Sequence, residues 1–398
     1  PLWTEGISTG NGQEIDIAIS ADGKYVAYST THGGGWYSYI QLLDNSGNSV
    51  WKAGGGSSTS LGRIYDIELS HNGSYLFAGT DGAGSDWRSK ELHLFGIDSA
   101  TPLWSWDPDV SNDACVDVDI STNNRLVAVC GSTSSNKDLS VWKVDSSTQI
   151  WSTSSIDFES AEISGDGNFI AAGNSGGTVY YYNYSSSSSI WDDDLASTDI
   201  RSVDISFDGK YVVAINSPPT TSSSHQVVVG YYDASNSILL DEYRKAHSDA
   251  GDPGWMVSIS ANGRYAAAGL SYDGFVVFEN GNGKKLALYP YSPISGSQIE
   301  IQNLAWVANS EDYSNLTFDV YLDTNSNPTT LVANDISTLS YTPSGLVKNT
   351  KYYWKVVATD PSGSKTSRVM NFTVPMTPEW TYTADNIRSV STSADGEY

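Results

Sequence analysis

The sequence has few basic residues, little cysteine and no long apolar run, and each scarcity narrows the possible functions. Its 21 Lys and Arg stand against 46 Asp and Glu, so the formal net charge is -25. Such a surface repels phosphate backbones and anionic lipid headgroups, so we expect no nucleic-acid partner and favour cations as counter-partners. A bilayer-spanning helix needs a run of about 18 apolar residues, and none of that length occurs. The sequence therefore predicts no membrane insertion.

The two cysteines, Cys115 and Cys130, fall in one predicted hairpin. If its turn occupies residues 121–124, Ile120 faces Arg125 and Cys115 lies directly opposite Cys130. Directly opposed residues of antiparallel strands come close enough for a disulfide. Two buried free thiols are the alternative. A disulfide would indicate an oxidising, extracellular setting.

One hairpin pattern recurs along most of the chain. Residues 200–214 read IRSVDISFDGKYVVA, in which alternating apolar residues lead into a Ser-x-Asp-Gly turn and a second strand. Its relatives begin near residues 14, 63, 115, 158, 255 and 388. A third strand follows, and then a fourth that carries Trp at 51, 104, 151 and 191. Four strands at a period of about 40 to 53 residues are the spacing of β-propeller blades. We therefore predict an all-β protein, with six complete blades and a closing N-terminal strand in residues 1–291.

The pattern changes over residues 292–376, which are predicted to form an immunoglobulin-like β-sandwich with Trp306 in its core. The tail, residues 377–398, returns to propeller strands, because its PEWTYT repeats the opening PLWTEG. In one interpretation the tail and residues 1–6 make a seventh blade. In the other the ring has six blades, and the tail belongs to a next repeat or completes a neighbouring chain. Since the sequence opens at Pro1 with neither Met nor a signal peptide and stops at Tyr398 inside a predicted strand, we expect it to be a mature or cut piece of a longer protein.

Two stretches carry family resemblances. The repeat resembles WD-repeat propellers and also the quinoprotein-like repeat, whose closing motif corresponds here to DNSGNSVW at 44–51. Residues 345–358, GLVKNTKYYWKVVA, resemble the fibronectin type III signature, which implies a seven-stranded sandwich with Tyr352 as its corner tyrosine. Propellers joined to such modules resemble archaeal and bacterial cell-surface proteins of the surface-layer type. The adjacent-cysteine disulfide of quinoprotein dehydrogenases is missing, so quinone chemistry is disfavoured.

Variable loops on one face of the propeller are the expected place for a binding site. Exposed aromatic rings beside charged side chains suit sugar or protein binding. The alternative is that these rings pack against their own loops. The ligand-binding candidates are Trp36, Trp87, Trp106, His32, Arg88, Asp107 and His247.

Carboxylates recur on the polar side of the innermost strands and are expected to converge on the propeller axis. They should raise one another's pKa or hold a divalent cation such as calcium, the one cofactor that the sequence suggests. The alternative is that they accept hydrogen bonds from amides of neighbouring blades. The metal candidates are Asp66, Glu68, Asp117, Asp119, Glu162 and Asp204, with Asp16 in the first blade. Asp107, Asp109 and Asp113 could share a cation, and residues 323–327 resemble the start of a calcium loop but favour a turn.

No stretch carries a catalytic motif, so no enzyme is predicted. The sequons at Asn72, Asn183, Asn315 and Asn371 are candidate glycosylation sites. The leading hypothesis is a non-enzymatic extracellular surface protein that mediates assembly or adhesion, with other copies of itself, other surface proteins or glycans as partners. A carbohydrate-binding or carbohydrate-cleaving propeller is the alternative, and a quinone- or metal-dependent oxidoreductase is the third.

Overall fold

The computed structural model describes residues 16–30, 38–56, 60–82, 87–108, 113–132, 136–217, 226–246, 256–270, 274–280, 286–293, 297–298, 303–310, 315–361 and 363–375. Regular structure in these ranges is nearly all β-strand, with a short 3₁₀ helix, η1 (Trp87–Ser89), in the second blade. No helix within these ranges is long and apolar enough to cross a membrane. The chain is an all-β protein, as the sequence predicts.

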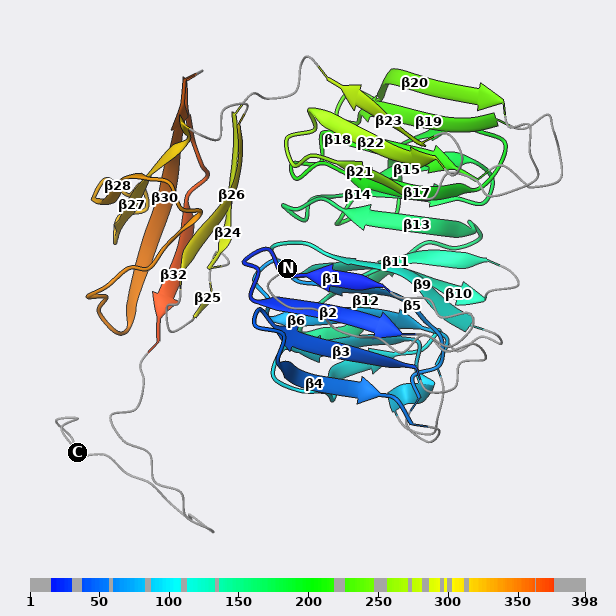
Figure 1. The fold of residues 1–398 in the computed structure, drawn as a ribbon, viewed down its shortest axis with the longest axis horizontal. Helices are drawn as coiled ribbons and strands as arrows, with labels where there is room; N and C mark the ends of the chain where they lie inside the picture. The colour runs from blue at the N-terminus through cyan, green and yellow to red at the C-terminus, as the bar shows by residue number, and fades with distance from the viewer. Residues whose placement is uncertain are drawn as a thin grey trace, which may run out of the picture.

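Five four-stranded sheets and one three-stranded sheet, all antiparallel, follow one another as propeller blades (Figure 1). Blades one to three comprise β1 (Ile17–Ile19), β2 (Tyr25–Thr30), β3 (Tyr39–Asp44), β4 (Ser49–Gly54); β5 (Ile64–Leu69), β6 (Tyr75–Thr80), β7 (Leu92–Gly96), β8 (Pro102–Trp106); and β9 (Asp113–Ile120), β10 (Arg125–Ser132), β11 (Lys137–Lys143), β12 (Ser146–Ser152). Blades four to six comprise β13 (Phe158–Ile163), β14 (Phe169–Asn174), β15 (Thr178–Asn183), β16 (Ser189–Asp194); β17 (Ile200–Ile205), β18 (Tyr211–Asn216), β19 (Gln226–Asp233), β20 (Ile238–Ala246); and β21 (Met256–Ile259), β22 (Tyr265–Leu270), β23 (Gly274–Glu279). The first strands of successive blades contact one another from β1 through β5, β9, β13 and β17 to β21, so they lie innermost.

The recurring Ser-x-Asp-Gly sequence forms each hairpin turn between the first two strands. In blade four, the Ser164 hydroxyl donates to Asp166 Oδ1 at 2.8 Å, and Gly167 adopts the positive φ of 72° that the reversal needs. The corresponding Ser-to-Asp or Ser-to-Asn contact occurs in all six described blades. In blade three Asn124 takes the place of the glycine with a φ of 60°. The turn that the sequence predicts between the first two strands is therefore present in each described blade.

The recurring Trp of the fourth strand joins one blade to the next. Its indole N–H donates to a backbone carbonyl just after the third strand of the following blade. These contacts are Trp51 to Ile97 at 2.9 Å, Trp104 to Val144 at 2.8 Å, Trp151 to Tyr184 at 2.7 Å and Trp191 to Ala234 at 2.8 Å. The apolar cores likewise combine residues of two successive blades, as Leu42 and Ile67 do in the first.

The predicted disulfide between Cys115 and Cys130 is present, with Cα atoms 4.1 Å apart. The strands reach it by a different register from the one expected, because Ile120 faces Leu126. A β-bulge farther along β9 shifts the register by one residue and brings the two cysteines opposite each other.

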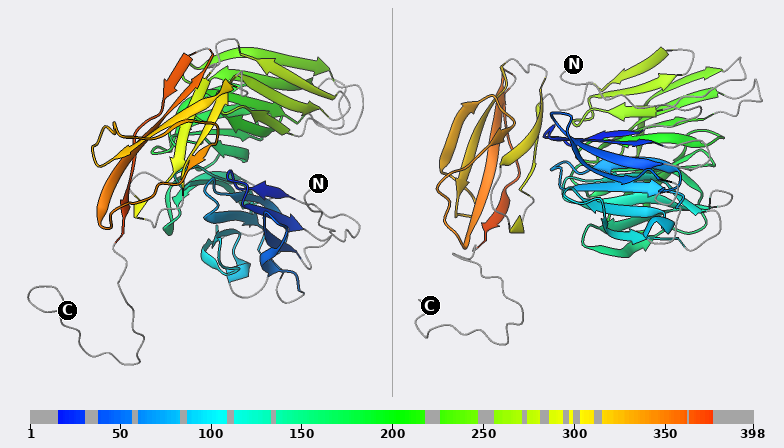
Figure 2. Two further views of the ribbon diagram at one scale, coloured as in Figure 1. Left: turned by 60° about the vertical axis from the view of Figure 1, so that its left-hand side comes forward. Right: turned by 60° about the horizontal axis from the view of Figure 1, so that its bottom comes forward.

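The series of blades has two uncovered ends (Figure 2). Ile67 of β5 faces blade one and is 1% exposed, whereas its counterpart Ile17 in β1 is 65% exposed. Val229 of β19 faces blade six and is fully buried, whereas its counterpart Phe275 in β23 is 76% exposed. Blade one therefore lacks a preceding blade, and blade six a following one, among the described residues.

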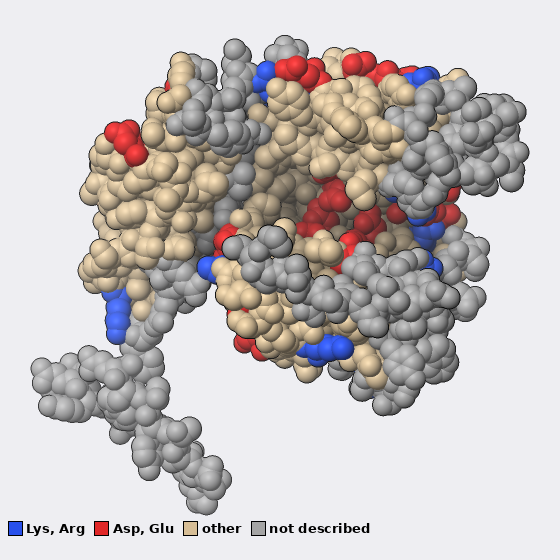
Figure 3. Space-filling view, in the orientation of Figure 1, with Lys and Arg blue, Asp and Glu red and all other residues tan. Residues whose placement is uncertain are grey.

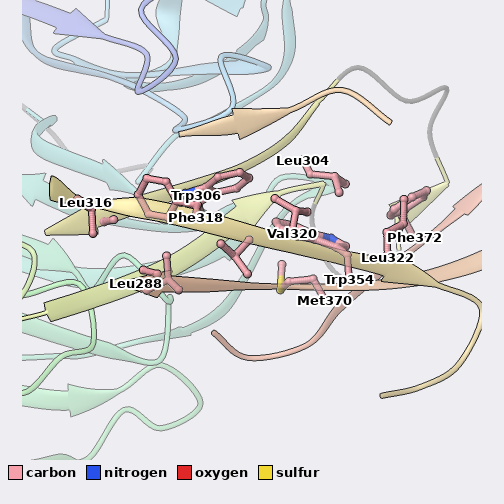
Figure 4. Packing of buried hydrophobic residues seen from close by; sticks show 13 residues of the cluster. Leu288, Leu304, Trp306, Leu316, Phe318, Val320, Leu322, Trp354, Met370 and Phe372 are labelled. Atoms are coloured by element: carbon pink, nitrogen blue, oxygen red, sulfur yellow. The ribbon is translucent and has the colours of Figure 1, made fainter. Parts of the chain in front are cut away.

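A two-sheet β-sandwich follows the propeller. One sheet contains β24 (Leu286–Ser292), β26 (Leu304–Ser310) and β29 (Ser340–Tyr341), and the other contains β25 (Ser297–Gln298), β27 (Thr317–Asp323), β28 (Leu331–Ile336), β30 (Thr350–Asp360), β31 (Gly363–Thr366) and β32 (Met370–Val374). Trp306 lies in its core, as predicted, with its ring 5.3 Å from Phe318 and 6.5 Å from Trp354 (Figure 4). The Tyr352 hydroxyl accepts the N–H of Val347 at 3.1 Å, which is the backbone contact of a corner tyrosine.

The fourth strand predicted for blade six belongs to the sandwich instead. β24, from the segment assigned to that strand, pairs with β26, and Leu288 is buried in the sandwich core. Blade six therefore has three described strands. The physical reason is that the apolar surface covering Leu288 is the sandwich core, which includes Leu304 and Trp306, and not blade six.

Candidate functional site

The carboxylates predicted at the axis form a ladder that links the innermost strands. Each of five accepts a backbone N–H from the following blade. These bonds join Asp16 to Ile67, Asp66 to Val118, Asp117 to Ala161 and Asp119 to Ile163, all at 2.8 Å, and Asp204 to Ile259 at 2.7 Å. The contacts are those of the alternative interpretation, in which the carboxylates bind neighbouring amides. A cation at the axis stays a prediction.

Burial gives this ladder an unusual electrostatic character. It raises the pKa of Asp66 well above the ordinary Asp value, and the charges of Asp117 and Asp16 raise it further. Burial also raises the pKa of Glu162 well above that of an ordinary Glu, and the charge of Asp119 adds to the effect. Burial and the neighbouring carboxylates therefore both favour the protonated form of Asp66 and Glu162. Figure 3 shows acidic side chains gathered in the hollow between the two ends of the blade series.

A second acidic cluster lies where blade two meets blade three. Within the described part of the chain, Glu91, Asp107 and Asp113 are the one group of three acidic, His or Cys side chains whose ligand atoms lie within 4.8 Å of one another. Asp107 follows β8 and Asp113 begins β9, so the two ends of the link between these blades supply them. Glu91 comes from the start of the third strand, where its N–H donates to Trp106 and its carbonyl accepts the N–H of Thr80.

Glu91 is the buried member of this cluster. Its side chain lies beneath the backbone of Gly82, where an added Cβ would come within 2.4 Å of Oε1. Burial raises the pKa of Glu91 to about 8, and the charges of Asp113 and Asp107 raise it in the same direction. The Lys90 ammonium contacts Asp107 at 2.8 Å, on the exposed side of the cluster.

A cavity of about 340 Å³ opens beside the same junction. Trp106 and Pro108 line it from blade two, and blade three contributes mostly polar groups, including Asp138 and Gln149. Asp138 Oδ1 is buried and has no hydrogen-bond partner in the structure as described. One aromatic wall and several polar groups make a site that suits a small polar ligand.

Two of the seven predicted ligand-binding residues, Trp106 and Asp107, lie at this junction. The ring of Trp106 also packs edge-on against Trp142, with centroids 5.2 Å apart. This contact agrees in part with the alternative interpretation, in which the predicted aromatic rings pack against the protein itself. Arg88 is half-buried in η1. His32, Trp36 and His247 lie outside the described residues, as do Asp109 and the side chain of Trp87.

The remaining candidates lie in turns or at strand ends. Asp323 accepts N–H bonds from Asn325, Thr329 and Thr330, which are the contacts of the favoured turn. Asn72 and Asn183 accept hydrogen bonds within turns, whereas the side chain of Asn315 is exposed. Asn371 is half-buried in β32.

Glu91 is a candidate ligand that the sequence did not reveal. It stands alone before an apolar strand, and only the packing of three strands brings it to Asp107 and Asp113. The spacing of those two aspartates at the ends of one link was the signal that could have located the cluster.

The repeated four-stranded blades define a β-propeller fold. No family model matches the sequence, and no curated protein matches it. Solved structures of similar fold include that of a mitotic checkpoint complex, at 14% identity over 66% of this chain and 72% of the other, with a TM-score of 0.50. The C-terminal WD40 domain of Sif2 is similar at 15% identity over 69% of each chain, with a TM-score of 0.51. At these identities the likeness establishes the fold alone.

Proposed function

We propose that this chain is a non-enzymatic extracellular scaffold that binds other proteins, and that it assembles by accepting the tail of a second copy. The observation that carries the proposal is the pair of uncovered apolar faces at the ends of the blade series. Ile17 and Ile19 are 65% and 62% exposed at one end, and Phe275 and Met256 are 76% and 66% exposed at the other. Exposed apolar faces of this kind mark interaction surfaces. The WD40 neighbours include a protein of a mitotic checkpoint complex, which favours protein partners.

The tail has the sequence of the element that these faces lack. Its hairpin pattern places Val390 where blade five has Val203, which is 2% exposed. A strand of this composition needs a blade face to cover it, and an uncovered sheet edge accepts another strand.

The geometry of the sandwich favours delivery of the tail to a second copy. β25 follows β24 and pairs in parallel with β32, so β32 ends near the end of β24. The chain therefore leaves the sandwich at the end opposite Leu286, where it enters from blade six (Figure 1). Blade six of the same chain lies back at the entry end.

The extracellular setting rests on the disulfide and on the resemblance of the sandwich to fibronectin type III modules. Disulfides persist in oxidising compartments. The Cys115–Cys130 bond therefore suits a surface protein. Asn315, an exposed sequon, is the glycosylation site that this setting would use.

The test is the solution mass of the chain as a function of concentration, with and without residues 377–398. We expect concentration-dependent assembly that is lost on truncation and in Val390→Asp. Arg388→Ala is the matched control, because Arg388 stands where blade five has the exposed Arg201, and it should assemble normally. A full chain that stays monomeric contradicts the proposal. If truncation then lowers the stability of that monomer, the tail closes its own ring.

The cavity beside Trp106 supports a second candidate function, glycan binding. Its aromatic wall and the buried Oδ1 atom of Asp138 suit a sugar hydroxyl. A glycan array on the wild type and on Asp138→Asn would identify such a ligand. Specific binding that Asp138→Asn abolishes would establish glycan binding, and uniform silence would exclude it for the glycans tested.

A further inference from the structure

We propose that Glu91, Asp107 and Asp113 bind one divalent cation, with calcium as the ion that the site fits best. Their carboxylate oxygens all lie within 4.8 Å of one another. Calcium binds oxygen ligands at about 2.3 to 2.6 Å, so two oxygens on one ion lie at most about 5 Å apart. The observed spacing therefore allows all three side chains to reach a single ion without a change of strand positions.

The hydrogen bonding of Glu91 points independently to a ligand. The residue is only 4% exposed, yet its Oε2 atom has no hydrogen-bond partner in the part of the chain that the structure describes. A buried carboxylate oxygen without a donor is costly. Glu91 also cannot turn away easily, because its backbone is held between the second and fourth strands of blade two and Gly82 lies against its side chain. A cation between Glu91 and the two aspartates would satisfy this oxygen.

The next blade junction shows how the fold neutralises a similar group of acids with its own residues. There the Lys137 ammonium lies 2.9 Å from both Asp157 and Glu159, and its side chain is 8% exposed. Lys90 occupies the corresponding position in blade two, but its side chain is 39% exposed and its ammonium contacts Asp107 at 2.8 Å. Glu91, the buried acid of this cluster, instead lies beside two further carboxylates, those of Asp113 and Asp107, whose charges raise its pKa.

Calcium suits this site better than magnesium because it accepts irregular coordination by carboxylates, with water as the remaining ligands. The three ligands come from the start of the third strand of blade two and from both ends of the link to blade three. A bound ion would therefore tie the two blades together on the loop face. This role is independent of the tail and of the uncovered blade ends.

Isothermal titration calorimetry of the full chain, stripped of metal with EDTA, tests the proposal with calcium and with magnesium. We expect about one calcium per chain with a dissociation constant on the order of 10⁻⁴ M, and weaker binding of magnesium. Glu91→Gln and Asp113→Asn should each weaken calcium binding at least tenfold. Lys90→Met should tighten it, because the competing ammonium is removed. Circular dichroism in EDTA identifies any variant that has failed to fold, and the other variant then carries the test.

Two control variants distinguish this site from other acids. Asp157→Asn alters the cluster that Lys137 already neutralises, and it should leave calcium binding unchanged. Asp119→Asn alters the axial ladder, and it should also bind calcium as the wild type does. Absence of binding to the wild type overturns the proposal. Binding that survives Glu91→Gln and Asp113→Asn but is lost in Asp119→Asn would assign the ion to the axis and overturn it equally.

Discussion

Asp204 should make the free energy of unfolding depend on pH in a way that one substitution isolates. Burial raises the pKa of its carboxyl to about 7, although the N–H groups of Ile259 and Ile205 oppose part of this effect. In an unfolded chain the pKa of Asp is about 3.9. Because the folded-state value is the higher one, the contribution of this group to stability is fully present below about pH 4 and is lost as the pH rises through about 7.

The expected magnitude follows from the size of this shift. Three pKa units correspond to about 4 kcal/mol, so we expect the free energy of unfolding to fall by about 2 to 4 kcal/mol over this range. Urea unfolding followed by tryptophan fluorescence between about pH 4 and about pH 8 measures it. Asp204→Asn keeps an oxygen that accepts the Ile259 N–H but removes the titration, so its stability should fall less over this range. Asp192→Asn, which removes an exposed carboxylate from β16, should behave like the wild type. If the free energy of unfolding depends on pH in the same way in the wild type and in Asp204→Asn, the reasoning is refuted.

Two further predictions concern cross-links between strands and blades. Replacing both Cys115 and Cys130 with Ala removes a bond between residues 15 positions apart. The loss should lower the free energy of unfolding by about 3 kcal/mol. If dithiothreitol leaves the unfolding midpoint of the wild type unchanged, this prediction is wrong. Lys137→Met leaves two carboxylates without their shared ammonium and should cost about 3 kcal/mol near neutral pH. Thermal unfolding of Lys137→Met should be compared with that of Lys143→Met. Lys143 is exposed on the same strand, so its replacement should change stability little.

The propeller could be predicted because its information is local and repeated. Alternation, the Ser-x-Asp-Gly turn and the spacing of Trp all lie within one hairpin or one blade, and each recurs often enough to be recognised. The disulfide shows the limit of such reasoning. Its pairing was predicted correctly, but the predicted register was off by one residue near the turn, and a bulge that no sequence rule revealed corrected it.

The features that the sequence did not reveal depend on contacts between distant segments. The partner of β24 is decided by which apolar surface covers Leu288, and an alternating strand fits either a blade or a sandwich. The acids at the axis were located correctly, but their amide partners lie some 40 to 55 residues away on the following blade, at chain separations that no local pattern encodes. Glu91 is the clearest case, since its neighbours become neighbours only after two blades have packed.

The Trp contacts between blades show where the propeller is weakest. Trp191 faces Tyr181 across the outer strands of blade four, and its ring stacks between Tyr181 and Tyr232 of blade five. At the junction of blades five and six the equivalent position, facing Tyr231, is the exposed Asp241. This junction therefore lacks the indole that links the earlier blades.

Asp241→Trp should restore that link. The new ring would pack against Tyr231 and Phe278, which already contact each other with centroids 5.9 Å apart, and its N–H would donate to the carbonyl of Asn280, the counterpart of Ala234. One added hydrogen bond and the buried ring together should stabilise the protein by about 1 to 2 kcal/mol in urea unfolding. Leu240→Trp is the control, because Leu240 corresponds to Ile190, which points outward and is 53% exposed. Equal effects of the two substitutions would mean that added apolar surface, and not the contact between blades, determines stability at this junction.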